Sequence, residues 1–311
     1  MNIVFMGTPD FARDSLKALV EAGHNIKMVI TNPDKPKGRG MKMIPSEVKV
    51  YALEQGLNIE QPLKIRNNEE ILEKIKSFSP DVLCVVAYGK ILPKEILDIP
   101  KYGSINVHGS LLPKYRGAAP IQWAVLNGDK ETGVTTMYMD EGMDTGDIIL
   151  KKSIEIGDND TTGEIWSRLS KVGAELLVET LKKIEEGTAP REKQSSEFSI
   201  APMLNKEIAK IDWQNKNSKE IKNLVRGLNP IMGAYTYMDE KKFKFWKVDV
   251  EEDYSLAEPG EVIVADSKNG LKIKTVDGVI SVLEIQGENA KKMSIFDYLR
   301  GNALTIGKKF K

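Results

Sequence analysis

Asn106, His108 and Asp144 are the residues of this chain whose types and spacing could do chemistry. An amide donor, an imidazole and a carboxylate are the groups needed to polarise a carbonyl and to move protons at a reacting amine. Residues 105–108 alternate apolar and polar side chains, which predicts a strand with Asn106 and His108 on one face. Gly109 ends this strand, so the pair should lie at a carboxyl end, where open α/β sheets bind ligands.

An acidic, glycine-containing turn at residues 140–147 follows a further predicted strand. It offers two carboxylates, Asp144 and Asp147, as partners for His108. A turn aspartate commonly satisfies its own backbone, and a lone histidine at a strand end is more often a hydrogen-bonded core residue. The asparagine two residues before the histidine and the acidic turn together favour a catalytic site, with Asp147 as the competing acid.

The composition limits the kind of protein. The 311 residues are too many for one small core and predict two domains, and 45 basic residues balance 45 acidic ones. Any contact with a polyanion therefore needs a local patch. The single cysteine, Cys84, lies in a predicted buried strand and excludes an intramolecular disulfide or a cysteine-rich zinc site. With no leader sequence and no run of about 18 apolar residues, we expect a soluble cytoplasmic protein.

The first part of the chain alternates predicted strands with predicted helices. The strands span residues 2–6, 27–31, 82–87, 105–108 and 134–139, and the helices span residues 11–21, 46–55, 68–78 and 162–186. This alternation predicts an α/β fold with a Rossmann-like wound, mostly parallel sheet. Gly7 follows the first strand, but the G-x-G-x-x-G spacing of a dinucleotide-binding turn is absent, so the sequence gives only weak support for an NAD site.

The second part of the chain has a shorter pattern. Residues 190–206 contain prolines and serines with little periodicity and are predicted to be a linker between a first domain, 1–189, and a second, 207–311. The second domain has predicted strands at residues 234–238, 242–250, 260–265, 271–275 and 280–285 and a final helix at 294–300. Short strands of this kind predict a C-terminal OB-like β-barrel.

Several short sequence motifs lie within or between the predicted strands and helices of both domains. They lie at residues 7–12, 38–46, 87–89, 106–113, 117–122, 144–147, 211–213 and 229–230. On these motifs the chain resembles the folate-dependent formyltransferases, and within them the methionyl-tRNA formyltransferase family, over essentially its whole length. The Asn-x-His and Ser-Leu-Leu-Pro segments are specific to formyl transfer, while the basic loop and the second domain narrow the resemblance to transfer RNA.

The resemblance implies a reaction and a catalytic set. The formyl group of 10-formyltetrahydrofolate would move to the α-amino group of methionine on initiator methionyl-tRNA, giving N-formylmethionyl-tRNA for translation initiation. Asn106 and His108 would bind the oxyanion that forms, and Asp144 would orient and charge the imidazole and relay protons. No metal is expected, since the histidines and the cysteine lie far apart in the sequence.

The resemblance also implies a folate pocket. Its expected residues are Ser110, Leu111, Leu112, Pro113, Tyr88, Gly89, Ile91, Met139 and Asp140. From the pattern alone, residues 111–113 could simply begin a helix after the strand. The folate would deliver the one-carbon unit, and the protein would orient the reactants.

A basic loop and a basic strand are the expected contacts to transfer RNA. Their residues are Lys35, Lys37, Arg39, Lys42, Lys242, Lys244 and Lys247. A run such as 35–42 is usually a solvated loop, but by resemblance it is a flexible element that enters the acceptor stem with Arg39 leading. The lysines at 242–247 are interleaved with aromatic residues expected to face the core, as in an ordinary barrel strand. We expect a monomer that binds folate and the acceptor stem of initiator methionyl-tRNA, and no membrane.

Two other functions stay open at this point. A folate-dependent formyltransferase acting on a nucleotide sugar or glycinamide ribonucleotide would need neither the basic loop nor an RNA-binding barrel. A non-catalytic RNA-binding module would not need Asn106, His108 and Asp144 intact. Departures from the family pattern bear on the strength of RNA contacts and not on the reaction, and they are Met41, Glu47, Ile231 and Met232.

Overall fold

The computed structural model describes residues 1–37, 41–252 and 256–311. The chain forms two compact units. The first unit comprises Met1–Pro120, Glu131–Glu155 and Trp166–Pro202, and the second comprises Ile121–Lys130, Ile156–Ile165 and Met203–Lys311. Each unit is therefore assembled from segments that are discontinuous in sequence.

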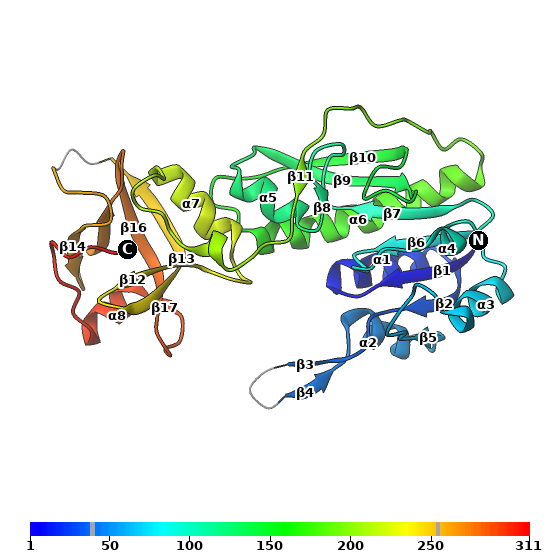
Figure 1. Ribbon diagram of the computed structural model, residues 1–311, viewed down its shortest axis with the longest axis horizontal. Coiled ribbons are helices and arrows are strands. Elements are labelled where there is room, and N and C mark those ends of the chain that lie inside the picture. The colour runs from blue at the N-terminus through cyan, green and yellow to red at the C-terminus, as the bar shows by residue number, and fades with distance from the viewer. Residues whose placement is uncertain (38–40, 253–255) are drawn as a thin grey trace. The chain divides into compact units, whose positions relative to one another are not determined.

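A seven-stranded sheet of order β10-β9-β7-β6-β1-β2-β5 forms the centre of the first unit (Figure 1). The strands are β1 (Asn2–Gly7), β2 (Asn25–Ile30), β5 (Ile59–Glu60), β6 (Val82–Val86), β7 (Ser104–His108), β9 (Glu131–Tyr138) and β10 (Ile148–Glu155). Neighbours from β7 to β5 are parallel, whereas β9 and β10 are added antiparallel. The predicted mostly parallel sheet is confirmed, and Cys84 in β6 is fully buried as expected.

Strand β10 was not predicted. Its middle residues, 151–153, are exposed and polar in succession, so they lack the alternation that marks a half-buried strand. It forms nevertheless, because an antiparallel ladder with β9 pairs its backbone along its whole length. An edge strand of this kind can be recognised only from its pairing with the neighbouring strand.

Four of the six helices described in this part of the chain were predicted, and the two short ones at residues 94–97 and 120–126 were not. The helices are α1 (Asp10–Glu21), α2 (Glu47–Glu54), α3 (Glu69–Ser77) and α4 (Lys94–Leu97), and α5 (Pro120–Leu126) and α6 (Thr162–Glu185) follow along the chain. Side-chain caps determine two of the starts. Ser46 Oγ accepts a hydrogen bond from Lys49 N at 3.1 Å, and Asn68 Oδ1 accepts one from Ile71 N at 3.2 Å.

Two segments without any predicted strand contain short ones. The arms of the basic loop, β3 (Lys35–Lys37) and β4 (Lys42–Ile44), pair antiparallel, and we call this pair of strands the hairpin. Within the predicted linker, β11 (Ile200–Ala201) pairs in parallel with β8 (Arg116–Gly117). Ladder hydrogen bonds satisfy the backbone in both places, which composition alone does not indicate.

An antiparallel sheet of order β12-β13-β16-β15-β14 forms the second unit, with β17 paired to β16. The strands are β12 (Ala234–Met238), β13 (Lys241–Glu251), β14 (Val262–Asp266), β15 (Gly270–Lys274), β16 (Val279–Gly287) and β17 (Met293–Ser294). The predicted final helix is α8 (Ile295–Gly301). The short helix η1 (Glu207–Ala209) and α7 (Ser218–Gly227) were not predicted, although Asn217 and Glu220 form a capping box before α7.

The last residues of the chain connect the two edges of this sheet. Val262 N of β14 donates a hydrogen bond to Lys308 O at 2.8 Å. Lys311 and Tyr237 of β12 exchange backbone hydrogen bonds at 2.8 and 3.0 Å. Between these contacts Phe310 is 2% exposed within the core of the unit. Among the described strands β12 and β14 do not pair directly, so the sheet itself is open.

In the part of the chain that the structure describes, no helix combines the length and the apolar character needed to cross a bilayer.

Candidate active site

Strand β7 positions an amide and an imidazole side by side. Ladders with β6 and β9 hold its backbone on both sides. Ile105 and Val107 are buried, whereas Asn106 and His108 both lie close to Asp144. The predicted alternation of residues 105–108 is therefore confirmed, and it brings the polar pair to the carboxyl end of β7.

The carboxylate of Asp144 lies between these two side chains. Its Oδ1 is 3.4 Å from Asn106 Nδ2 and 3.6 Å from His108 Nδ1. Its Oδ2 accepts a hydrogen bond from the backbone N–H of Gly117 at 2.8 Å. Asp144 has φ of 55°, a left-handed conformation that aspartate adopts more readily than most residues. The structure thus gathers the three predicted residues around one carboxylate.

The backbone carbonyl of Tyr115 determines which nitrogen of His108 carries the proton. His108 Nε2 lies 2.9 Å from Tyr115 O, and the histidine is only 6% exposed. A carbonyl oxygen can only accept, so Nε2 is protonated and donates this hydrogen bond. In the neutral ring Nδ1 is then the basic nitrogen, and it faces Asp144.

Asp147 is held away from the histidine. Its Oδ2 forms an ion pair with Arg191 Nε at 3.0 Å, and the Arg191 guanidinium lies 4.1 Å from the centre of the Tyr138 ring. Asp140 also has its partners within the turn, since its Oδ1 accepts hydrogen bonds from Gly142 N and Thr145 Oγ1. Of the acids in this turn, only Asp144 faces His108 among the described contacts.

The segment after His108 turns back onto the sheet. Ser110 is buried and its Oγ donates to Lys114 O at 2.5 Å, while Leu112 is 1% exposed. Leu111 and Pro113 are only partly buried, and residues 111–115 form turns and not the start of a helix. Leu111 and Pro113 therefore have surface to offer a ligand, whereas the serine and Leu112 shape the backbone.

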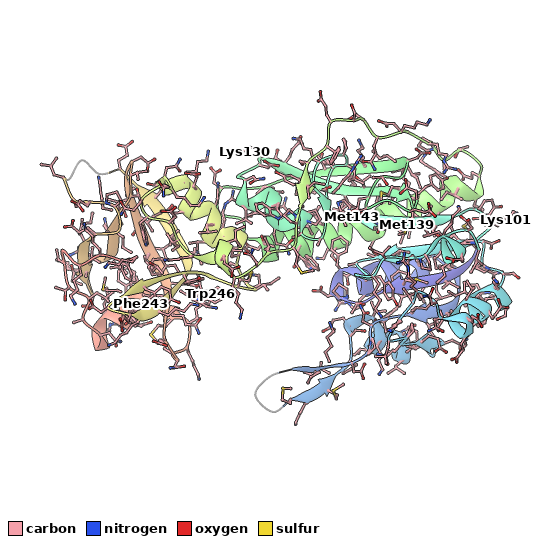
Figure 2. All side chains as sticks on the ribbon, viewed as in Figure 1. Lys101, Lys130, Met139, Met143, Phe243 and Trp246 are labelled. Carbon is pink, nitrogen blue, oxygen red and sulfur yellow. The ribbon has the colours of Figure 1, made fainter. Side chains whose placement is uncertain are left out.

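The residues after β6 supply a second wall with a buried and an exposed part. Tyr88 is 2% exposed and packs in the same core cluster as Met139, which is labelled in Figure 2. Burial raises the pKa of Tyr88 to about 12, and its hydroxyl has no hydrogen-bond partner among the described residues. Gly89 borders open space, and Ile91 is 70% exposed. Gly89 and Ile91 therefore leave surface open after β6, whereas Tyr88 packs inward.

Comparison with known proteins identifies the family of this chain. A family model described as formyl transferase matches residues 1–181, and one described as formyl transferase, C-terminal domain, matches residues 203–303. A methionyl-tRNA formyltransferase of Clostridioides difficile is 51% identical over 308 residues, 99% of each chain. That of Caldanaerobacter subterraneus is 50% identical, again over 308 residues and 99% of each chain. This chain belongs to the methionyl-tRNA formyltransferase family.

Solved structures share the fold of this formyltransferase. HypX from Aquifex aeolicus, in complex with tetrahydrofolic acid, matches with a TM-score of 0.66 at 17% identity over 99% of this chain. The match spans only 50% of HypX, which is a longer protein. WlaRD, a sugar 3N-formyl transferase in the presence of dTDP and 5-N-formyl-THF, matches with a TM-score of 0.66 at 21% identity over 94% of this chain and 99% of that one.

The hairpin of β3 and β4 carries the predicted acceptor-stem lysines of the formyltransferase. Lys35 and Lys42 are exposed, and Lys37 lies opposite Lys42 in the ladder. Arg39, the predicted leading contact, lies outside the described residues. Met43 is 61% exposed beside these lysines, so the hairpin presents apolar surface together with charge.

Strand β13 carries the second set of predicted RNA contacts. Lys242 Nζ lies 3.8 Å from the centre of the Tyr235 ring. Lys244 Nζ donates to Met232 O at 2.7 Å and lies 5.6 Å from the centre of the Trp246 ring. Burial, followed by the charge of Lys242, lowers the pKa of Lys244. We call this surface the aromatic–basic face, and its residues are Tyr235, Tyr237, Lys242, Lys244 and Trp246.

Trp246 and Lys247 correct the predicted pattern of β13. Trp246 was expected to face the core with Phe243 and Phe245, and only the two phenylalanines are buried. Strict alternation places Trp246 on the face of Lys244 instead, where it is partly exposed (Figure 2). The ladder with β16 is irregular on both sides of Lys247, and this bulge leaves Lys247 exposed where alternation would bury it.

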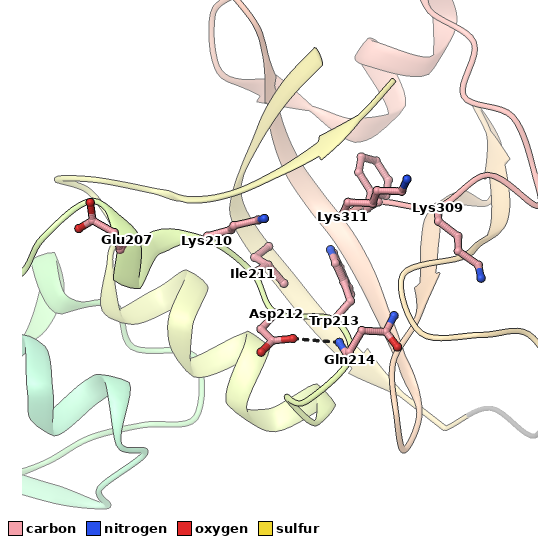
Figure 3. Close-up of a pocket in the computed structure, with 9 residues that line it drawn as sticks. Glu207, Lys210, Ile211, Asp212, Trp213, Gln214, Lys309 and Lys311 are labelled. Carbon is pink, nitrogen blue, oxygen red and sulfur yellow. Dashed lines mark hydrogen bonds between the residues drawn. The ribbon is translucent and has the colours of Figure 1, made fainter. Parts of the chain in front are cut away.

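A hollow of about 530 Å³ also lies in the second unit (Figure 3). Its lining comprises Glu207, Lys210, Ile211, Asp212, Trp213, Gln214, Lys309, Phe310 and Lys311. Ile211 and Trp213, which belong to one of the family motifs, are 1% and 2% exposed and are part of the core. The charged side chains are of both signs, and none of the predicted site residues lines the hollow.

Among the described residues, no three His, Cys, Asp or Glu side chains are grouped so that they could hold a metal ion.

Proposed function

We propose that this enzyme transfers the formyl group of 10-formyltetrahydrofolate to the α-amino group of methionine on initiator methionyl-tRNA. The product, N-formylmethionyl-tRNA, serves translation initiation. One observation carries the proposal. Asn106, His108 and Asp144 converge at the carboxyl end of β7 in a chain that is about half identical to methionyl-tRNA formyltransferases over its full length.

Asn106 is the proposed donor to the oxygen of the formyl group. When the amine nitrogen attacks the formyl carbon, the C=O electrons move onto oxygen and an oxyanion develops. The Asn106 amide has two N–H groups, of which one is directed at Asp144 Oδ1 over a long 3.4 Å, so the other can be given to this oxygen. A preorganised donor of this kind in a largely buried site stabilises the transition state more than the ground state.

His108 and Asp144 are the proposed proton carriers. The attacking amine must lose a proton, and the departing N10 of the folate must gain one. His108 Nδ1 faces Asp144 with Nε2 already committed to Tyr115 O, so Nδ1 takes and returns the proton. The Asp144 carboxylate, 3.6 Å away, stabilises the imidazolium that forms and orients the Asn106 amide.

The segments on either side of this cluster are the proposed folate site. We assign Ser110, Leu111, Leu112, Pro113, Tyr88, Gly89, Ile91, Met139 and Asp140 to it. Ser110, Leu112 and Tyr88 are buried, so they support its shape, while Leu111 and Ile91 offer the apolar contact. Bound there, the folate supplies the one-carbon unit, and the chain holds the acceptor amine against it.

The lysines of the hairpin and of the aromatic–basic face, with Arg39 and Lys247, are the proposed contacts to transfer RNA. Exposed ammonium groups on a hairpin can reach phosphates of an acceptor stem. Lysines held over aromatic rings on β13 keep their charge at a defined place on the surface.

Finer features of the protein are also proposals. The C-terminal residues that connect β12 and β14 support an OB-like barrel closed by the chain end. We further propose domains at residues 1–189 and 207–311 joined by 190–206, a monomeric state and a location in the cytoplasm.

The test of this function is formyl transfer from 10-formyltetrahydrofolate to three acceptors: charged initiator transfer RNA, an amino-sugar nucleotide and glycinamide ribonucleotide. We expect product from the transfer RNA and none above background from the two small acceptors. Efficient formylation of either small acceptor, with none of the transfer RNA, would overturn the proposal.

A further inference from the structure

Residues 191–201, most of the predicted linker, lie along the site. Glu192 and Ile148 of β10 exchange backbone hydrogen bonds at 2.8 and 3.0 Å. Further on, β11 pairs with β8, which contains the Gly117 whose N–H binds Asp144. We call residues 191–201 the strap.

Gln194 connects the strap to the turn of Asp144 through two hydrogen bonds and to Arg116 through two more. Its Nε2 donates to Asp144 O and to Gly146 O, both at 2.8 Å. Its Oε1 accepts from Arg116 Nε at 3.0 Å and from Arg116 Nη2 at 2.7 Å. One side-chain amide thereby uses both of its N–H groups and both lone pairs of its oxygen, which is its full capacity.

The turn is a place where such support matters. Asp144 has φ of 55°, and a Cβ on Gly146 would lie 1.7 Å from Tyr138 O, so the backbone is seated tightly in a conformation few residues adopt. The carboxylate reaches Asn106 and His108 only at 3.4 and 3.6 Å. A small rotation of the turn would therefore separate the carboxylate from its partners.

Arg116 fixes the other end of Gln194. It is only 8% exposed, and its guanidinium lies 4.5 Å from the centre of the Phe198 ring, which also belongs to the strap. Hydrogen bonds from a charged donor are roughly twice as strong as neutral ones. The Gln194 amide is thus held in one orientation, with its N–H groups directed at the turn.

The strap also supports the partner of His108. Ser199 Oγ accepts a hydrogen bond from Tyr115 N at 2.8 Å, and Tyr115 O is the acceptor for His108 Nε2. The two groups that must stay aligned, the imidazole and the carboxylate, are therefore both braced by one segment.

We propose that Gln194 is a positioning residue for formyl transfer, acting through Asp144 from the strap. This inference rests on the proposed function, since it concerns the carboxylate of that reaction. Gln194 itself need not touch either substrate. It keeps the Asp144 turn in the conformation in which the carboxylate faces both Asn106 and His108.

Two substitutions separate positioning from mere packing. Gln194→Glu keeps an acceptor for Arg116 but cannot donate to Asp144 O or Gly146 O. Gln194→Ala removes all four hydrogen bonds. We expect both to lower kcat by about tenfold to hundredfold, because displacing a reacting group by about an ångström can cost a hundredfold. The KM for 10-formyltetrahydrofolate should stay within about twofold.

The matched control is Ser195→Ala, since Ser195 is next in the chain and exposed, and its Oγ donates to Glu197 O within the strap. This variant should have the kcat of the unsubstituted enzyme. Full kcat in Gln194→Glu with loss only in Gln194→Ala would assign the residue to holding Arg116 and overturn the proposal. If circular dichroism shows that Gln194→Ala does not fold, Arg116→Lys is the substitute variant. It disrupts the pair of hydrogen bonds from Arg116 to Gln194 Oε1 and should lower kcat at least tenfold. Unchanged kcat there would also overturn the proposal.

A double-mutant cycle supplies the decisive readout. In single-turnover assays, adding Gln194→Glu to Asp144→Asn should change the remaining rate by less than about twofold, because a residue that acts through Asp144 has nothing left to position. An undiminished loss in that background would show that Gln194 acts elsewhere. The unsubstituted enzyme separates the two hypotheses: no formylation of charged transfer RNA contradicts the proposed function, whereas normal formylation with unaffected Gln194 variants contradicts only the positioning role.

Discussion

The Asp144 turn of the first unit and the aromatic–basic face of the second build polar surface in opposite ways. Around Asp144, the Gly117 N–H binds one carboxylate oxygen and the Tyr115 carbonyl binds His108 Nε2, and His108 is 6% exposed. On the aromatic–basic face, Lys242 lies over a tyrosine ring and is partly exposed. The first surface is held by hydrogen bonds from several segments, while the second keeps cationic side chains near solvent.

The difference suits the roles proposed for the two surfaces. Stabilising charge that develops on one oxygen requires donors already in place, since reorganisation would consume the advantage. Attracting phosphates requires only positive charge near the surface, and that attraction tolerates side-chain motion and is weakened by salt. Substitutions in the first region should therefore change kcat, and substitutions in the second should change KM and salt dependence.

The largest effect is expected for His108→Ala and Asn106→Ala. Each should lower kcat by about a hundredfold or more, because each removes a group that acts on charge or protons in the transition state. Folate binding, measured by fluorescence titration, should be nearly unchanged. Loss of folate binding with full turnover at saturation would contradict the division between the two regions.

The next effect is expected for Asp144→Asn, measured beside Asp147→Asn. Asp144→Asn should lower kcat by about a hundredfold, since a neutral amide cannot stabilise an imidazolium. Asp147→Asn should lower it by less than about threefold, because Asp147 pairs with the exposed Arg191. Thermal melting of both variants controls for unfolding. The reverse order of severity would mean that Asp147 is the functional acid.

A smaller effect, confined to RNA binding, is expected at the hairpin. Arg39→Ala, and separately Lys35→Ala with Lys42→Ala, should raise the KM for charged transfer RNA about threefold to tenfold while the KM for folate is unchanged. Each lost phosphate contact should flatten the salt dependence of binding by roughly 0.7–0.9 log units per decade. Kinetics at two salt concentrations measure this. An unchanged slope would remove the hairpin from the RNA site.

The smallest effect is expected on the aromatic–basic face. Lys242→Ala should raise the KM for transfer RNA about twofold and leave kcat alone, as one exposed cation contributes little by itself. Lys268→Ala, an exposed lysine in the turn between β14 and β15, is the matched control for loss of one charge. Equal effects of the two variants would mean that bulk charge acts here and not this particular face.

The local pattern of the sequence predicted the longer strands other than β10, the helices α1, α2, α3, α6 and α8, and the pairing of Asn106 with His108. A period of two along residues 105–108 is enough to place both side chains on one face, and burial of their apolar neighbours confirms it. Ser46 and Asn68 likewise marked helix starts through their own side chains. These features depend on residues close together in the chain, so the sequence alone determined them.

Only the tertiary structure decided the features that depend on distant partners. The choice between Asp144 and Asp147 depends on Gly117 N–H and on Arg191, neither of which the turn itself contains. The strap has no periodicity, because its order comes from hydrogen bonds to β8, β10 and the turn and not from an apolar face. A bulge in β13 leaves Lys247 exposed. The end of the chain is held by hydrogen bonds to the edge strands β12 and β14. Hydrogen bonds between segments far apart in sequence leave no repeating pattern in either segment, so such contacts become evident only once the chain is folded.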